Sequence, residues 1–222
     1  MVNCALNKRV TLFCGHYGSG KTNIAVNFAI AKARAGENIS IADIDIVNPY
    51  FRTKDSTAEL ESAGVHVVSL PFANSSVDLP AIPAEVMGLL QRRDIKVIMD
   101  VGGDDRGAVA LGRYAPTILS ENDYDMVFVV NFFRPLTRTP GEALEIMREI
   151  EAACKIPFTA IINNSNIGEE TTAEAIEKTV ALAEKLSEIS GLPLVGTTVK
   201  EEFAKNFGDD KIFSLSLQEK MF

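Results

Sequence analysis

The chain has 222 residues, of which 46% are hydrophobic and 23% charged, a balance and a length that suit one globular domain. Its net charge is -8 and it has no dense cluster of Lys and Arg, which argues against binding to nucleic acid or to an anionic membrane. No apolar run approaches the roughly 20 residues of a membrane span, and Met1–Arg9 is too short and polar for a secretion signal. These features predict a cytoplasmic protein.

Short apolar segments alternate with segments of helical periodicity along the chain. Several of the apolar segments are hydrophobic along nearly their whole length, as expected of strands covered on both faces. The predicted strands are Val10–Cys14, Ile39–Asp43, Val65–Leu70, Val97–Val101, Met126–Val130, Phe158–Ile162 and Leu194–Thr198. The alternation predicts parallel strands joined by right-handed crossovers. The expected fold class is α/β: a doubly wound, mostly parallel sheet with helices on both faces, formed by one domain over residues 1–222.

The glycine-rich segment GHYGSGKT follows the first predicted strand and precedes a helical run over residues 23–35. It matches the pattern G-x-x-x-x-G-K-[ST], in which glycines allow backbone N–H groups to point at a polyphosphate and the helix N-terminus favours anions. The residues expected to hold nucleotide phosphates are Gly15, His16, Tyr17, Gly18, Ser19, Gly20, Lys21 and Thr22. Lys21 would place a charge between the β- and γ-phosphates, and the Thr22 hydroxyl would ligate Mg²⁺. The alternative, a glycine-rich turn with an accidental lysine, does not explain the strand and helix on either side.

Two carboxylates lie at the end of the second predicted strand. Asp43 is the last residue of that strand, and Asp45 follows two positions later. We expect this strand to end beside the first, so that one carboxylate holds a Mg-bound water and the other orients the attacking water. A solvated strand end with helix-capping aspartates is the alternative interpretation.

A third carboxylate, Asp100, ends the apolar run Lys96–Asp100, which is typical of a Walker B strand. Asp100 would bind Mg²⁺ through water, and Gly103 would offer its N–H to the γ-phosphate. A loop with two adjacent glycines, Gly102 and Gly103, is able to move when that phosphate leaves.

Capping patterns mark two helices in the second half of the chain. Thr139 with Glu142, and Thr171 with Glu174, each have the spacing of a capping box. Gly191 follows the second helical run, in the position where helices commonly stop.

The glycine-rich loop, the pair Asp43 and Asp45, and the segment Asp100–Gly103 together resemble the deviant Walker ATPases of the MinD/ParA type, over roughly residues 9–200. The resemblance implies binding of ATP and ADP and Mg²⁺-dependent hydrolysis. It implies that Asp45 positions the lytic water beside Lys21, that Asp43 supports Mg²⁺, and that Asn163 contacts adenine.

The position directly after the first glycine departs from this family. The family has a Lys there that reaches across an ATP-bound dimer, whereas this chain has His16 followed by Tyr17. We therefore expect that ATP alone does not drive a sandwich homodimer through this residue, and that a possible homodimer would form through other surfaces or need the client protein. The alternative is that His16 only packs against Tyr17 and shapes the loop. Arg52 and Lys54 are other candidate sources of charge, and a solvated loop is the alternative for both.

The expected function is a nucleotide-dependent conformational switch with slow ATP hydrolysis that acts on a client protein of unknown identity. One alternative is an ATP-dependent ligase or kinase of the dethiobiotin-synthetase type, which would need a substrate pocket, for example from residues 71–83. The other is a non-hydrolysing nucleotide-binding partner protein, against which the three aspartates argue. The run Asn163-Asn164-Ser165-Asn166 lacks the carboxylate that guanine-specific relatives use, which favours adenine.

Overall fold

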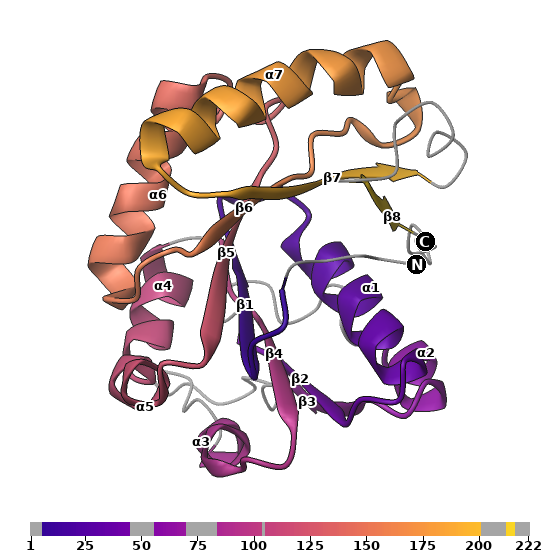
Figure 1. Cartoon of the computed structure of the whole chain (residues 1–222), viewed down its shortest axis with the longest axis vertical. Helices are drawn as coiled ribbons and strands as arrows, with labels where there is room; N and C mark the ends of the chain where they lie inside the picture. Colours follow the sequence, from indigo (N-terminus) through magenta and orange to yellow (C-terminus); the bar gives the residue numbers. More distant parts are fainter. Residues whose placement is uncertain (1–5, 45–55, 70–83, 104, 201–211, 216–222) are drawn as a thin grey trace, which may run out of the picture.

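The computed structural model describes residues 6–44, 56–69, 84–103, 105–200 and 212–215, and its strands form one eight-stranded sheet (Figure 1). The strands are β1 (Val10–Cys14), β2 (Ile39–Asp43), β3 (His66–Ser69), β4 (Lys96–Asp100), β5 (Tyr124–Val130), β6 (Ala160–Asn163), β7 (Leu194–Lys200) and β8 (Ile212–Leu215). All neighbouring strands pair in parallel, in the order β3-β2-β4-β1-β5-β6-β7-β8.

Helices cover both faces of this sheet, which confirms the predicted fold class (Figure 1). The helices are α1 (Lys21–Arg34), α2 (Thr57–Ser62), α3 (Ala84–Gln91), α4 (Asp105–Gly112), α5 (Ala115–Glu121), α6 (Pro140–Cys154) and α7 (Ala173–Ser190), with a 3-10 turn η1 (Gly168–Glu170). Buried side chains of α1 and α2 pack with Phe13 and Ile98 on one face. Those of α3 to α7 pack with Leu12 and Met99 on the other. The alternation of side chains along each strand supplies both cores.

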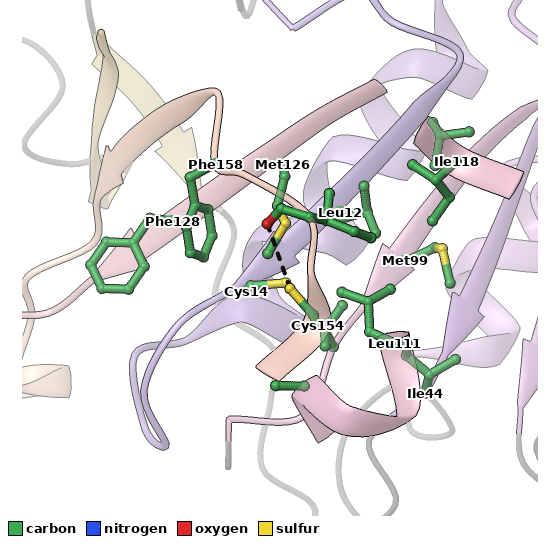
Figure 2. Packing of buried hydrophobic residues seen from close by; sticks show 14 of the residues in the cluster. Leu12, Cys14, Ile44, Met99, Leu111, Ile118, Met126, Phe128, Cys154 and Phe158 are labelled. Carbon is green, nitrogen blue, oxygen red and sulfur yellow. Dashed lines mark hydrogen bonds between the residues drawn. The ribbon is translucent and has the colours of Figure 1, made fainter. Parts of the chain in front are cut away.

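Figure 2 shows part of the core on the face of the sheet that α3 to α7 cover. The Phe128 and Phe158 rings meet edge to face with centroids 5.3 Å apart. Cys14 and Cys154 lie within the same cluster, and burial raises the pKa of both thiols. These two cysteines therefore act as small apolar side chains, as their scattered positions in the sequence suggest.

The central strand is β1, which lies between β4 and β5. The expectation that the second strand ends beside the first is wrong, because β4 lies between β1 and β2 and pairs with both. The chain therefore leaves β1 toward one edge of the sheet and later continues from β5 toward the other. Ligands of such sheets bind at the carboxyl ends of the strands where the order reverses, which is where β1 leads into the glycine-rich segment.

The capping prediction for α6 is confirmed. The Thr139 hydroxyl accepts a hydrogen bond from the Glu142 nitrogen at 3.2 Å, and Glu142 Oε2 accepts one from the Thr139 nitrogen at 2.9 Å. The two residues therefore satisfy donors that the first turn of the helix leaves open.

The capping prediction for α7 is wrong by one residue. Thr172 is the N-cap, and its hydroxyl accepts from the Ala175 nitrogen. Thr171 instead donates to the Gly168 carbonyl at 2.7 Å and closes the preceding turn. Gly191 ends the helix with φ +75°, as predicted.

Candidate functional site

The glycine-rich segment forms a tight loop between β1 and α1 at the carboxyl edge of the sheet. Gly15, Gly18 and Gly20 have φ of +152°, +76° and +85°. A Cβ at Gly15 would lie 2.3 Å from the Val129 carbonyl oxygen, and one at Gly20 would lie 2.2 Å from Asn164 Nδ2. These positions therefore require glycine for both backbone conformation and space.

Lys21 is the first residue of α1, and its side chain is largely buried. Its Nζ donates to the His16 carbonyl oxygen at 3.3 Å, so the ammonium group lies over the loop. His16 Nδ1 lies 3.1 Å from the Tyr17 carbonyl oxygen, and the Tyr17 side chain is 64% exposed. The loop thus combines the ammonium group of Lys21 with the N-terminus of α1, an arrangement suited to an anion.

Asp43 and Asp100 lie opposite each other at the ends of β2 and β4. Residues paired in register on parallel strands point to the same face, and this face is the one that α1 covers, because Ile41 and Ile98 two positions earlier pack with α1. Asp100 is 2% exposed and Asp43 is half-buried. Both carboxylates therefore lie on the side of the sheet where α1 carries Thr22.

Carboxylate and hydroxyl oxygens are the ligands that Mg²⁺ prefers, so Thr22, Asp43 and Asp100 fit a magnesium ion in their donor chemistry. Asp45, Arg52, Lys54 and residues 71–83 lie outside the described residues, so the roles predicted for them stay predictions. The described ranges contain no cluster of three or more His, Cys, Asp or Glu side chains with metal-binding geometry.

The loop after β4 packs directly against the glycine-rich loop. A Cβ at Gly103 would lie 2.7 Å from Lys21 Nζ and 2.7 Å from the Tyr17 nitrogen. A Cβ at Gly107, in the first turns of α4, would lie 2.7 Å from the Gly102 Cα and carbonyl oxygen. The structure thus places Gly103 beside the predicted phosphate site, and connects its loop to α4.

Asn163 ends β6 and is completely buried. Its Nδ2 donates to Thr179 Oγ1 at 3.0 Å and to Thr197 Oγ1 at 3.5 Å, and its Oδ1 accepts from the Ser165 nitrogen and hydroxyl. The amide is therefore engaged with the protein on both sides, and its predicted contact with adenine stays a prediction.

Asn164, which the sequence does not distinguish from the neighbouring asparagines, contacts the glycine-rich loop directly. Its Nδ2 donates to the Ser19 carbonyl oxygen at 2.6 Å, and its Oδ1 accepts from the Thr198 hydroxyl. Asn164, which directly follows β6, therefore joins the glycine-rich loop to β7. The available signal was its place directly after a buried strand within a run rich in asparagine.

A surface pocket adjoins Asn164 at the carboxyl ends of β6 and β7. It is lined by Asn164, Asn166, Thr171, Ile176 and Thr198, among others. The pocket combines amide and hydroxyl groups with an apolar wall, and it lies next to the loop that Asn164 holds. The pocket is small and partly open, and it lies at the edge of the sheet where ligands of α/β sheets bind.

Solved structures of the signal recognition particle receptor FtsY share this fold. FtsY from Thermotoga maritima is 18% identical with a TM-score of 0.58, over 90% of this chain and 65% of that chain. FtsY from Elizabethkingia anophelis is 19% identical with a TM-score of 0.57, over 88% and 60%. The signal recognition particle 54 kDa protein from Aeropyrum pernix, in complex with GDP, is 16% identical with a TM-score of 0.55, over 88% and 42%.

These similarities show the fold of the chain, which is the α/β fold of the P-loop NTPases. The chain spans less than two thirds of the length of each of these three proteins. No family model and no curated protein matches its sequence. In the described ranges, no helix has the length and apolarity needed to cross a membrane.

Proposed function

We propose that the chain binds Mg-ATP at residues 15–22 and hydrolyses it slowly, as a nucleotide-dependent switch of the MinD/ParA type that acts on a protein client in the cytoplasm. The observation that carries the proposal is the loop between β1 and α1: three glycines with positive φ, followed by a buried lysine at a helix N-terminus. The backbone N–H groups of such a loop bind polyphosphate, and the lysine adds a charge at the β- and γ-phosphates.

Thr22, Asp43 and Asp100 are the proposed magnesium site. When bound there, Mg²⁺ neutralises the charge that develops on the β- and γ-phosphate oxygens. Asp45 is the proposed residue that orients the attacking water. The paired register of Asp43 and Asp100 supports this assignment, because it brings two carboxylates to the face that α1 covers.

The close packing of Gly103 against the loop supports a switch. A γ-phosphate near Lys21 would compete for the space beside Gly103, since even one Cβ has no room there. Binding of a triphosphate, but not of a diphosphate, would then favour a different position of the loop after β4. Such a difference between two nucleotide states is what a conformational switch requires.

Adenine is the proposed base, and the pocket beside Asn164 is its proposed site. Residues 163–166 bring amide groups and no carboxylate to this edge, and the next residue is Ile167. An amide both donates and accepts, which suits the 6-amino edge of adenine, whereas guanine selection uses a carboxylate acceptor. The Aeropyrum pernix protein of the same fold is in complex with GDP, so the proposal of adenine rests on these residues and not on the fold.

Calorimetric titration of ATP and GTP tests the proposal on wild type, Lys21→Ala and the control Lys178→Ala. Lys178 is an exposed lysine of α7 in an i,i+4 pair with Glu174. We expect ATP to bind more tightly than GTP, and Lys21→Ala to lose roughly 10–150-fold in ATP affinity, the effect of one charge-assisted contact. Unchanged ATP affinity in Lys21→Ala would refute the phosphate site, and tighter binding of GTP would refute the choice of base.

A second prediction concerns hydrolysis. We expect Asp45→Ala to bind ATP with wild-type affinity and to lose single-turnover hydrolysis, because a group that orients water acts chiefly in the transition state. If Asp45→Ala hydrolyses ATP within a few-fold of the wild-type rate, another residue orients the water, and Asp43 becomes the candidate.

A further inference from the structure

The loop between β5 and α6 reaches the glycine-rich loop through an arginine. Arg134 Nε donates to the Gly18 carbonyl oxygen at 3.0 Å, across 116 positions of sequence. A Cβ at Gly18 would lie 3.3 Å from the same nitrogen, so the guanidinium group lies directly against the loop backbone. This contact is separate from Lys21 and from the three aspartates discussed above.

Hydrogen bonds within and around the β5–α6 loop fix the place of Arg134. Asn131 accepts from the Arg134 nitrogen at 3.1 Å and from the buried Thr137 hydroxyl at 2.8 Å, both through its carbonyl oxygen. The Phe132 nitrogen donates to the Ser165 hydroxyl at 3.0 Å. These hydrogen bonds therefore fix the conformation of the β5–α6 loop.

The same loop contains Leu136 in the left-handed region, with φ +66°. Non-glycine residues seldom adopt this conformation, and they keep it where the surrounding structure determines it. Leu136 is also 59% exposed, so packing in the core does not account for the turn.

The guanidinium group of Arg134 retains most of its hydrogen-bonding capacity. Its side chain is exposed, and within the described ranges neither terminal nitrogen has a hydrogen-bond or ion-pair partner. Arginine stays charged at all physiological pH values and presents its donors in a fixed planar fork that matches phosphate oxygens. One donor is thus committed to the loop, and the others are available to a ligand.

Arg134 lies beside the path from the glycine-rich loop to the pocket at β6 and β7. It binds the Gly18 carbonyl, while Asn164 binds the next carbonyl, that of Ser19, and also lines the pocket. Asn131 Nδ2 donates to the carbonyl oxygen of Asn166, another residue of the pocket wall. If the base of a nucleotide lies in the pocket and its terminal phosphates lie at Lys21, its sugar and the phosphate nearest the sugar would lie close to Arg134.

We propose that Arg134 is a nucleotide-positioning residue, whose Nε holds the glycine-rich loop at Gly18 while its terminal nitrogens contact the phosphate nearest the sugar of a bound nucleoside diphosphate or triphosphate. The proposal rests on the proposed nucleotide site. Arg134 thus supplies a cation to the glycine-rich loop from the β5–α6 loop, whereas His16 lies within the glycine-rich loop itself. Because the first phosphate is common to both nucleotides, Arg134 serves ADP and ATP equally.

Calorimetry of ADP and ATP binding to the full chain tests this with Arg134→Ala, Arg134→Lys and the control Arg138→Ala, an exposed arginine of the same loop. We expect Arg134→Ala to lower the affinity for both nucleotides by the same factor of about 10, the loss of one charge-assisted contact. Arg134→Lys should recover part of it, since it keeps the charge but not the fork. Arg138→Ala should match wild type.

Two further measurements separate contact with the ligand from bracing of the loop. The phosphorus-31 resonance of the α-phosphate of bound ADP should shift in Arg134→Ala, and the urea midpoint of the nucleotide-free protein should fall only slightly, through the loss of one exposed hydrogen bond to the Gly18 carbonyl. Wild-type ADP affinity in Arg134→Ala, a loss confined to ATP, or a lower urea midpoint with an unshifted α-phosphate resonance would each overturn the inference. Failure of the wild-type chain to bind ADP or ATP would instead refute the proposed function, and this inference with it.

Discussion

At Gly103, the loop after β4 approaches the glycine-rich loop closely enough to exclude a side chain. A Cβ there would lie 2.7 Å from both the Tyr17 nitrogen and Lys21 Nζ. We expect Gly103→Ala to lower the free energy of unfolding by about 1–3 kcal/mol, the usual cost of overpacking, and to weaken nucleotide binding. Urea unfolding measures the first effect and calorimetry the second.

Gly88 provides the matched control for this substitution. It lies within α3, and a Cβ there would meet no atom within 4 Å. Gly88→Ala should raise the free energy of unfolding by about 0.5–1 kcal/mol, because alanine loses less backbone entropy in a helix than glycine does. Equal stability changes at the two positions would contradict the close packing of Gly103.

The contacts of Asn163 and Asn164 show the limit of sequence reasoning at this scale. The sequence identifies a polar run after an apolar strand, but adjacent residues at a strand end point in different directions. Which of the two amides faces the glycine-rich loop depends on where β6 ends, and a shift of one residue exchanges them. The same holds for Arg134, whose partner lies 116 positions away and leaves no local pattern.

At the scale of elements, the capping box of α6 is the local feature that the sequence predicted most fully. We expect Thr139→Ala to lower the free energy of unfolding by about 1 kcal/mol, because it leaves the Glu142 nitrogen without its acceptor. Urea unfolding of Thr139→Ala, Glu142→Ala and the double variant measures the coupling between the two side chains.

The exposed Glu149 of the same helix supplies the control, since Glu149→Ala changes the helix surface without altering the cap. It should change the free energy of unfolding by less than about 0.5 kcal/mol. Fully additive effects of Thr139→Ala and Glu142→Ala would contradict a reciprocal capping box in solution.

Element boundaries were predicted less well where another contact competes with the pattern on which the prediction rests. Phe158 was assigned to a strand, yet its nitrogen donates to Glu151 Oε1 at 2.7 Å and β6 begins only at Ala160. The predicted start of α7 was wrong because two adjacent threonines can both cap, and the turn before the helix uses the first. β8 was missed, since its four residues form a strand only by pairing with β7.

At the scale of the whole molecule, Arg9, the residue before β1, joins this strand to α3 and α5. Its guanidinium group donates to the Leu90 and Arg92 carbonyl oxygens at 2.9 and 2.8 Å and forms an ion pair with Glu121. Both ionic side chains are less than 10% exposed. Hydrogen bonding to Arg9 lowers the pKa of Glu121 despite the opposing effect of burial, and Arg93 lowers it further.

This ion pair predicts a pH dependence of stability. Because the pKa of Glu121 is lower in the folded state, its contribution is complete above the unfolded value of about 4.3 and is lost as pH falls through the folded value. We expect Glu121→Gln to cost about 3 kcal/mol at neutral pH, since it leaves Arg9 buried without a counter-charge. The difference from wild type in urea unfolding should shrink steadily below about pH 4.

Glu174→Gln is the control, because Glu174 pairs with Lys178 on an exposed helix surface. Exposed pairs of this kind contribute little to stability, so Glu174→Gln should unfold at nearly the wild-type urea midpoint at every pH. A constant difference between Glu121→Gln and wild type from pH 7 to pH 3 would contradict the lowered pKa of Glu121.

The alternation of strands and helices correctly predicted the fold class, because each unit is encoded locally and parallel pairing follows from the crossovers. The order of strands could not be read in the same way. The second strand was placed beside the first, whereas β4 lies between them. The sequence of β2 does not indicate whether it pairs with β1 or with β4, since β1, β2 and β4 are all apolar and similar in length.

The contact between Gly107 and Gly102 makes the loop after β4 and the helix α4 one mechanical unit. With no space for even a Cβ between them, the loop cannot move toward α4 unless the first turns of the helix move as well. That helix displays Val109, 59% exposed, on the outer surface of the molecule. If the proposed switch operates, the loss of the γ-phosphate at the carboxyl edge of the sheet would therefore reorient a patch of the outer surface.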